Sequence, residues 1–520
     1  MILQSLFKPR VRSIPNSLGY LCLHLHFYQP PREDPFTGVV PREPTGDSHH
    51  DFNEKIYAEC YRKIAQAYTF RSISFNIGPT LARWLEISHP NLWQVIREDE
   101  RWHFNRYGVS NALAQPYNHT ILPLIDSVEY DRDTSTQIEW GIAAYAHMFG
   151  HKPAGMWLPE TAVDLAVLDR MAQMGIRYTI LSGSQLAKDS PIDRAKPATV
   201  KLFHNRSITV FFRDDFVNGM MTDGSKNLTV GYGSADRFAK ERLPHYYDKF
   251  APLTLLAMDA ETFGHHIARG DTFLSYLLTT AAPNEGFGVC SLEYYLNRYG
   301  VSQTAEITQR SSWSCRHGLT RWECGCDCDR SGGYQQWKEV LRHALNNLSK
   351  KASELYEIEV RTVLPVPHEA RNGYIGLHDG WGREGDFWKV YGRNGKGPSE
   401  SQLNYTTRLL LEAQYFLQQA FTSCAWYWES YESTEVKFVL NAARRAMHLI
   451  FQATGVDFQK AFIDDLQKIG GYPQGYAYQP LNTIAQCAFE KRVYRGNSRF
   501  SVKIGDRVPL FGKSAFSRLF

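Results

Sequence analysis

The stretch LTLLAMDAETFGHH, residues 253–266, is an apolar run that stops at two carboxylates and two histidines. The apolar part predicts a buried strand, and Asp259 stands where that strand leaves the core. An ordinary turn is the alternative, with Asp259 as a helix N-cap and Glu261 as a first-turn acid. His265 and His266 would then lie in solvent. The rest of the sequence has to decide between a functional site and a turn.

Six further segments share the apolar, β-branched or aromatic character of that strand. They are residues 20–26, 72–78, 111–115, 154–159, 176–182 and 208–214. Helical patterns lie between several of them, and this alternation predicts a parallel sheet, either open or closed into a barrel. Seven candidate strands suit an α/β fold of the incomplete (β/α) barrel type.

Two strand-to-helix junctions are well marked. In NIGPTLARWLE, Pro79 suits the first turn of a helix. After WLPE, Thr161 with Asp164 three residues later resembles a capping box, and Gly175 is expected to end the helix that follows.

The character of the chain changes near residue 300. We expect the barrel over residues 1–300, a Cys- and Gly-rich connector over 301–333, a helical domain over 334–470 and a basic tail of unknown structure over 471–520.

Three segments of the helical domain have Leu and aromatic residues at three-and-four spacing, which predicts helices over 334–360, 399–423 and 433–454. The stretch 370–397 between the first two is rich in glycine and is expected to be a loop.

Composition narrows the functional classes. The 520 residues carry a net charge of only +4, so nucleic-acid binding has no electrostatic basis. No apolar run of about 18 residues predicts a membrane span. The nine cysteines are an odd number, and five stand alone in sequence, which is typical of reduced cytosolic thiols. We therefore expect a cytoplasmic protein.

Polar residues follow three other predicted strands. HLHFYQPP (24–31) contains His24, His26 and Gln29, and histidines at i and i+2 of a strand point to one side, although a core histidine is an equally good interpretation. AQPYNHTILPL (114–124) contains His119, which also fits an ordinary turn.

The third segment, GMWLPETAVD (155–164), ends its strand with Trp157 and Glu160. Glu160 alone would suit the positive end of the next helix. Together, the two side chains would form a carboxylate beside an aromatic face on which a sugar can stack. Because the carboxyl ends of barrel strands meet at one face, residues from all four segments are expected to converge there.

Two carboxylates at separate strand ends meet the needs of glycosidic-bond cleavage. One carboxylate attacks the sugar carbon or guides the attack, and the other protonates the departing oxygen. Glu160 and Asp259 fit these roles, and neighbouring histidines can bond sugar hydroxyls and adjust the pKa values of the carboxylates.

The four segments resemble, in order, the first four motifs of glycoside hydrolase family 57, whose members are α-glucan-acting amylases, glucanotransferases and branching enzymes. The resemblance implies an incomplete seven-stranded barrel followed by a helical domain against its active face, with Glu160 as nucleophile and Asp259 as general acid/base. It implies an α-glucan substrate, no cofactor, and substrate-binding roles for His24, His26, Gln29, His119, Trp157, Glu261, His265 and His266.

The fifth family motif resembles TSCAWYWES (422–430), which implies that Trp426 contacts substrate. The match departs from the family pattern, because Cys424 and Ala425 stand where a single Asp often precedes the Trp. The whole chain, including RSSWSCRHGLTRWECGC (310–326), is similar to a bacterial subgroup of the family with an uncharacterised C-terminal domain.

Two other functions remain open on the sequence. A metal-dependent polysaccharide deacetylase would use His24, His26, Asp259, His265 and His266, which are residue types that bind divalent metals. A carbohydrate-binding protein whose enzyme fold has lost its catalytic activity would need neither Glu160 nor Asp259.

Four clustered cysteines, Cys315, Cys324, Cys326 and Cys328, are candidate zinc ligands, with His317 nearby. The Cys-x-Cys-x-Cys spacing is tighter than the usual gap of two to four residues, which favours reduced thiols in a loop.

Overall fold

The computed structural model describes residues 17–125, 132–222, 232–243, 250–328, 335–398 and 401–467. The predicted basic tail over 471–520 lies outside these residues. The chain divides into two units by its internal contacts. The first comprises the chain through Gln29, Arg42–Pro116 and Tyr145–Ser314, and the second comprises Pro30–Pro41, Tyr117–Ala144 and the chain from Cys315 onward.

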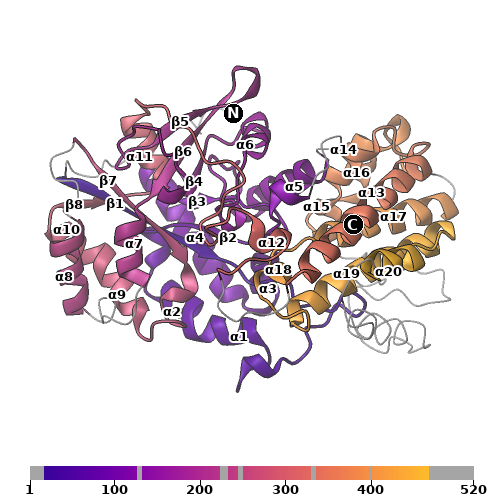
Figure 1. Ribbon diagram of the computed structural model, residues 1–520, viewed down its shortest axis with the longest axis horizontal. Coiled ribbons are helices and arrows are strands. Elements are labelled where there is room, and N and C mark those ends of the chain that lie inside the picture. Colours follow the sequence, from indigo (N-terminus) through magenta and orange to yellow (C-terminus); the bar gives the residue numbers. More distant parts are fainter. Residues whose placement is uncertain are drawn as a thin grey trace, which may run out of the picture. The chain divides into compact units, whose positions relative to one another are not determined.

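A parallel sheet organises the first unit (Figure 1). Its strands are β1 (Gly19–Phe27), β2 (Ser74–Ile77), β3 (Ala112–Leu113), β7 (Leu253–Asp259) and β8 (Phe287–Val289). They run in the order β3-β2-β1-β7, and β8 also pairs with β1. All nine residues of β1 are buried, as expected for a parallel strand covered on both faces.

A second sheet contains β4 (Tyr178–Ser182), β6 (Ser207–Arg213) and the antiparallel β5 (Ala198–Lys201). Parallel bridges link Ala114 to Met156 and Gly155 to Tyr178, and the amide of Asp214 donates to the carbonyl of Leu255 (2.9 Å). Backbone hydrogen bonds therefore connect the two sheets. Each of the seven predicted strand segments contributes a strand or a bridge, which confirms the barrel-like α/β prediction, whereas β5 and β8 were not predicted.

Helices accompany these strands. They are α1 (Phe52–Ile56), α2 (Arg62–Gln66), α3 (Pro79–Ser88), α4 (Pro90–Tyr107), α6 (Leu165–Gln173), α7 (Asp215–Thr222), α8 (Tyr232–Arg242), α9 (Gly270–Tyr276), α10 (Ala282–Asn284) and α11 (Leu292–Tyr299). Helix α5 (Arg132–Phe149) begins in the second unit and ends in the first.

The two predicted helix starts have different outcomes. Pro79 occupies the first turn of α3, as expected. The capping box at Thr161 is wrong, because Asp164 is the N-cap of α6 and its side chain accepts from the Val167 amide (2.8 Å). Thr161 instead lies in a preceding 3₁₀ turn, Pro159–Thr161.

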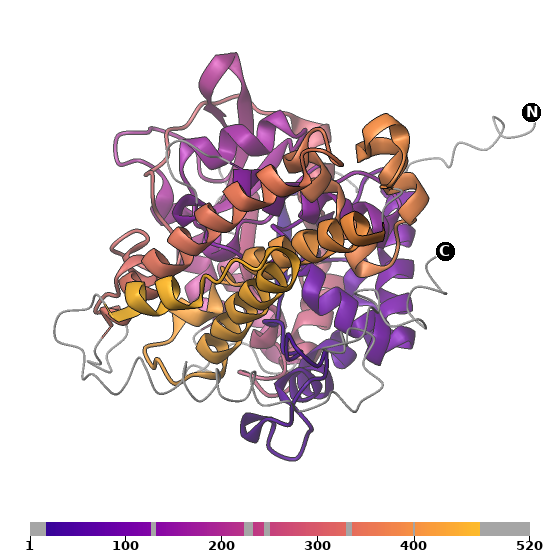
Figure 2. The same ribbon diagram turned by 90° about the vertical axis from the view of Figure 1, so that its right-hand side faces the viewer.

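The second unit is helical (Figure 2). Its helices are α12 (Thr320–Glu323), α13 (Trp337–Val360), α14 (Pro367–Gly373), α15 (Ile375–Asp379), α16 (Glu384–Tyr391), α17 (Ser401–Gln419), α18 (Cys424–Tyr427), α19 (Thr434–Thr454) and α20 (Gln459–Gln467). The three long predicted helices correspond to α13, α17 and α19.

The glycine-rich stretch 370–397 is not a plain loop, since α14, α15 and α16 occupy much of it. Its glycines stand mainly at the helix ends, where Gly380 takes the left-handed conformation that closes α15. None of the helices in the described part of the chain has both the length and the apolar character needed to cross a bilayer.

Candidate active site

The carboxyl end of β7 carries two acidic side chains. The strand is buried up to Met258, and the side chain of Asp259 at its end is accessible to solvent although protein surrounds its carboxyl group. A 3₁₀ turn, Ala260–Thr262, follows and buries Glu261. In the register of the parallel pair β1–β7, Asp259 lies opposite His26.

Glu261 is held from two sides. Its Oε1 accepts hydrogen bonds from Gln29 Nε2 (3.0 Å) and from the hydroxyl of Tyr61. Gln29, predicted to bind substrate, therefore bonds a carboxylate. Desolvation raises the pKa of Glu261, against the lowering effect of these hydrogen bonds.

The carboxyl of Asp259 has a strongly raised pKa. Desolvation by the surrounding protein raises the pKa of Asp259 well above its usual range, and the charges of Glu261 and Glu160 raise it further, while Arg213 opposes them. A carboxyl with a raised pKa keeps its proton to higher pH, as a general acid requires.

Glu160 has an unusual backbone and a fixed carboxylate. Its φ of 56° is left-handed, a conformation that is uncommon for non-glycine residues. The Oε2 atom accepts hydrogen bonds from Trp313 Nε1 (2.9 Å) and Ser314 Oγ (2.6 Å). The carbonyl of Glu160 also accepts from the Trp313 amide (3.1 Å), so the backbone and the side chain of Glu160 are held by one segment.

His24 and His26 form a buried polar layer with Asn76. His24 Nε2 lies 3.0 Å from Asn76 Oδ1, and His26 Nδ1 lies 2.9 Å from Asn76 Nδ2. Burial lowers the pKa of His24 to about 3 and that of His26 to about 4, so both rings are neutral at pH 7. Asn76 also donates to Gln115 Oε1 (2.7 Å).

Trp157 packs beneath this layer. Its ring stacks on His24 and His26 at centroid distances of 5.0 and 5.2 Å, and Trp313 meets it edge-on at 5.0 Å. Trp157 is fully buried. The ring therefore supports the histidines and does not offer the open stacking face that the sequence indicated. Trp313 is only partly buried and contacts Glu160, which makes it the aromatic ring beside the carboxylate.

The turn after β7 is anchored to the segment ahead of α2. Gly264 has a φ of +138°, and a Cβ there would lie 2.4 Å from the carbonyl oxygen of Glu59. This close approach places His265 Nδ1 2.6 Å from the Glu59 carboxylate. His266 is exposed and packs on His265.

Two predicted residues belong to the second unit. His119 Nδ1 lies 2.6 Å from Ser423 Oγ. Trp426 is fully buried, donates from Nε1 to the carbonyl of Lys338 (3.1 Å) and faces the Arg342 guanidinium at 4.3 Å. Substrate contact by His119 or Trp426 stays a prediction.

Sequence reasoning missed four residues of this arrangement. Asn76 and Arg213 lie at or near the ends of predicted strands, and the amide side chain within the buried run SFNI was the available signal for Asn76. Trp313 and Ser314 lie in the stretch that was assigned to a connector, and no local pattern marks them.

The proposed deacetylase ligands do not form a metal site. Both ring nitrogens of His24 already bond side chains, Nδ1 to Ser74 (3.1 Å) and Nε2 to Asn76. In the described part of the chain, one group of three or more His, Cys, Asp and Glu residues has its ligand atoms gathered, and it consists of Cys315, His317, Cys326 and Cys328. Cys324 is not in that group.

Comparison with known proteins agrees with the fold and with the motifs. A family model described as glycosyl hydrolase family 57 matches residues 21–308, more than half of the chain. A second model, a domain of unknown function (DUF3536), matches residues 334–471. No curated protein matches the chain.

Solved structures share the fold at low sequence identity. An exo-type maltose-forming amylase from Pyrococcus sp. ST04 has a TM-score of 0.66 at 13% identity, with 86% of this chain and 82% of that chain covered. A branching enzyme from Thermococcus kodakaraensis has a TM-score of 0.58 at 14% identity, with 89% and 96% covered. A 4-α-glucanotransferase from Thermococcus litoralis has a TM-score of 0.50 at 14% identity, with 84% and 59% covered.

The four motifs, the strand arrangement and the match over residues 21–308 lead to one assignment. The chain is a member of glycosyl hydrolase family 57, a family of glycoside hydrolases and glucanotransferases, and it carries a C-terminal domain of unknown function.

Proposed function

We propose that the protein is a retaining glycoside hydrolase or transglycosylase that acts on α-glucans, with Glu160 as the nucleophile and Asp259 as the general acid/base. The observation that carries the proposal is the pair of unlike carboxyls: Glu160 held by two donors, and Asp259 with a raised pKa. The amylase, branching-enzyme and glucanotransferase relatives support an α-glucan as the substrate.

In the first step, ionised Glu160 attacks the anomeric carbon while protonated Asp259 gives its proton to the departing glycosidic oxygen. The bond to the leaving sugar breaks, and an ester forms between Glu160 and the glycosyl group. Trp313 and Ser314 donate to Oε2 of Glu160 and so hold the attacking carboxylate in place.

In the second step, water or a sugar hydroxyl attacks the ester and gives its proton to Asp259. Esterification has removed the negative charge of Glu160, which is one of the charges that raises the pKa of Asp259. The pKa of Asp259 therefore falls in the intermediate, and the same group that served as an acid becomes a base.

Product analysis with amylose and maltooligosaccharides tests this proposal. The wild type should produce new reducing ends or rearranged chains, and Glu160→Gln and Asp259→Asn should each abolish them. Addition of azide distinguishes the roles, because a small anion replaces a missing nucleophile and yields a glycosyl azide of inverted configuration from Glu160→Ala. Asp259→Ala should instead yield a glycosyl azide of retained configuration, because its nucleophile is intact.

Three outcomes would contradict the proposal. If neither variant loses activity, the two carboxyls are not the catalytic pair. If the wild type leaves every α-glucan unchanged but releases acetate from acetylated oligosaccharides in a metal-dependent way, the deacetylase alternative is correct. Binding of α-glucans without any turnover would favour the carbohydrate-binding alternative.

A further inference from the structure

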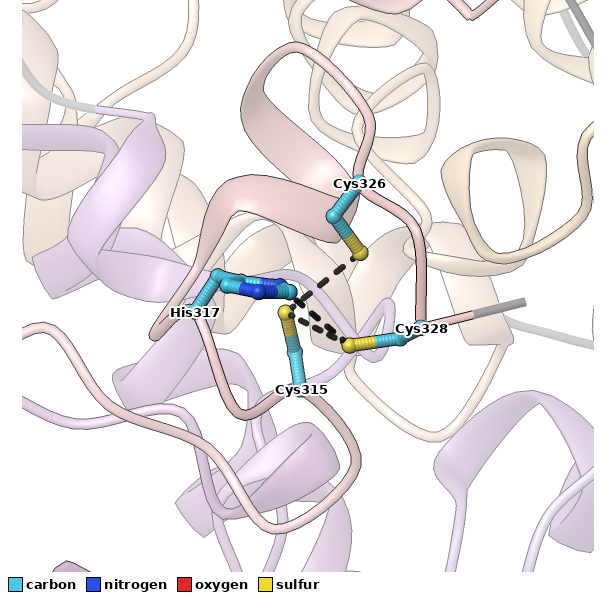
Figure 3. Close-up of side chains that lie close together, drawn as sticks. All are labelled: Cys315, His317, Cys326 and Cys328. Atoms are coloured by element: carbon cyan, nitrogen blue, oxygen red, sulfur yellow. Dashed lines mark hydrogen bonds between the residues drawn. The ribbon is translucent and has the colours of Figure 1, made fainter. Parts of the chain in front are cut away.

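Three cysteines and one histidine of the second unit converge around α12 (Figure 3). Cys315 and His317 precede the helix, and Cys326 and Cys328 follow it. Each residue directs one ligand atom inward, and all four atoms lie within 4.8 Å of one another. Neither the glycosidase chemistry nor the family assignment gives these side chains a role.

We propose that Cys315, His317, Cys326 and Cys328 bind one Zn²⁺ ion. Three of the separations between ligand atoms fit the edges of a tetrahedron. The Sγ of Cys315 lies 3.6 Å from that of Cys326 and 3.7 Å from that of Cys328, whose Sγ lies 3.5 Å from His317 Nδ1. Bonds of about 2.3 Å to sulfur and about 2.1 Å to nitrogen require edges of about 3.8 Å between sulfurs and about 3.6 Å between sulfur and nitrogen.

The tight spacing is compatible with this geometry. Each pair of ligands, Cys315 with His317 and Cys326 with Cys328, has one residue between its members. Turns make this possible: the amide of Gly318 donates to the carbonyl of Cys315 (3.1 Å), and residues 327 and 328 also lie in a turn. Each pair thereby brings its two ligand atoms to adjacent places in the cluster. Cys324, by contrast, directs its sulfur toward the carbonyl of Gly325 (3.9 Å).

His317 has an outer partner of the kind that metal-bound histidines use. Its Nε2, the nitrogen away from the sulfurs, lies 3.3 Å from Asp327 Oδ1. Arg316 Nε lies at the same distance from this nitrogen (3.3 Å), and a carboxylate in this place favours the tautomer with its proton on Nε2, in which Nδ1 can bind a metal. Arg316 in turn pairs with the other oxygen of Asp327 (3.0 Å).

A disulfide does not account for the cluster. Sulfur–sulfur separations of 3.6 and 3.7 Å are far longer than the bond of about 2.05 Å in a disulfide, and a third sulfur would remain unpaired. As neutral thiols the three cysteines would gain only weak hydrogen bonds from this arrangement, whereas a cation between them would bind all three sulfurs. Zinc is the preferred cation, since a set of three thiolates and one imidazole selects it.

The site is structural, because four protein ligands leave no position open for a substrate. The ion would close the chain from Cys315 to Cys328 around α12, which is already docked on α13. Lys338 donates to the carbonyl of Arg321 (3.1 Å), and Arg342 donates twice to the carbonyl of Trp322 (2.9 and 2.7 Å). Cys315 also directly follows Ser314, so the ion would anchor one end of the segment that holds Glu160.

Metal analysis of the full chain, purified with its thiols reduced, tests the site. We expect one zinc per chain in the wild type and its loss in Cys326→Ser and Cys328→Ser. Cys324→Ser is the matched control, because it removes a neighbouring thiol outside the cluster and should keep the zinc. The wild type in which Co²⁺ replaces zinc should show the strong visible absorption of tetrahedral cobalt with thiolate ligands.

The cobalt spectrum keeps the proposal testable even if the serine variants fail to fold, because it needs only the wild type. His317→Cys offers rescue, since a fourth thiolate should retain the metal and shift the cobalt band. A wild type without zinc and without the tetrahedral cobalt spectrum would overturn the proposal. Equal zinc loss in Cys324→Ser and Cys326→Ser, or a disulfide found among these residues by mass spectrometry, would overturn it as well.

Discussion

Trp313 and Ser314 are positioning residues for Glu160 under the proposed mechanism. Each hydrogen bond to a charged group contributes about 1.5–3 kcal/mol, so loss of either donor should lower kcat by about 10- to 100-fold. We expect Trp313→Phe and Ser314→Ala to lower kcat more than they raise KM for maltooligosaccharides, because the donors act on the nucleophile.

Ser314→Thr is the matched variant, since it keeps the hydroxyl and should retain most of the activity. A purely structural effect would lower the melting temperature and the amount of active enzyme and leave kcat per active site unchanged. Titration of active sites with a mechanism-based fluorosugar separates these results.

Glu261 should control the pH dependence through its charge. The basic limb of kcat/KM is expected to report the loss of the Asp259 proton, and Glu261 is one of the charges that raises the pKa of Asp259. Glu261→Gln removes that charge and should shift the basic limb to lower pH. Glu59→Gln is the control, because Glu59 bonds His265 and is not among the groups that shift Asp259. An unmoved limb in Glu261→Gln would contradict the assignment of Asp259 as the acid.

Asp259 should also reduce stability at neutral pH. Because the folded chain keeps the Asp259 proton to higher pH than the unfolded chain, the free energy of unfolding decreases as pH rises from the usual aspartate pKa to the raised one. Asp259→Asn should therefore be inactive yet have a higher melting temperature than the wild type at pH 7, with the gain vanishing below pH about 4. Asp189→Asn, at an exposed site, should change neither property.

At the scale of an element, the start of α6 determines how the chain leaves Glu160. The Asp164 side chain caps the helix, and Thr161 instead bonds Gln185 and the Trp313 amide (2.7 and 3.0 Å). Loss of an N-cap costs about 1 kcal/mol, so Asp164→Ala should lower the free energy of unfolding by about that amount. Denaturant unfolding measures the change, and Asp164→Asn should preserve most of it because Asn also caps well. An unchanged free energy of unfolding in Asp164→Ala would contradict the capping role of Asp164.

At the scale of the whole molecule, the proposed glycosidase reaction should not depend directly on the proposed zinc ion. Glu160 and Asp259 need no metal, and a zinc site closed by four protein ligands takes no part in turnover. Brief exposure to EDTA should leave the rate on amylose unchanged, whereas prolonged removal of zinc should lower the melting temperature. Initial rates with and without EDTA check this. Immediate loss of activity that Zn²⁺ or Mg²⁺ restores would instead place a metal in the reaction.

The sequence by itself determined the fold class, the seven strand segments, the three long helices and the family. These features rest on local patterns, namely apolar runs that end at polar residues and helical spacing of Leu and aromatic residues. The structure keeps these elements because the apolar faces that the patterns mark are the faces whose burial drives folding.

Only the tertiary structure decided which side chains meet. Trp313 and Ser314 reach Glu160 across more than 150 residues of chain, Trp157 is covered by His24 and His26, and His317 rather than Cys324 completes the thiol cluster. The segment Tyr117–Ala144 joins the helical unit although it lies between predicted strands. Such contacts depend on how distant segments pack in three dimensions, and no pattern within one segment of the sequence carries that information.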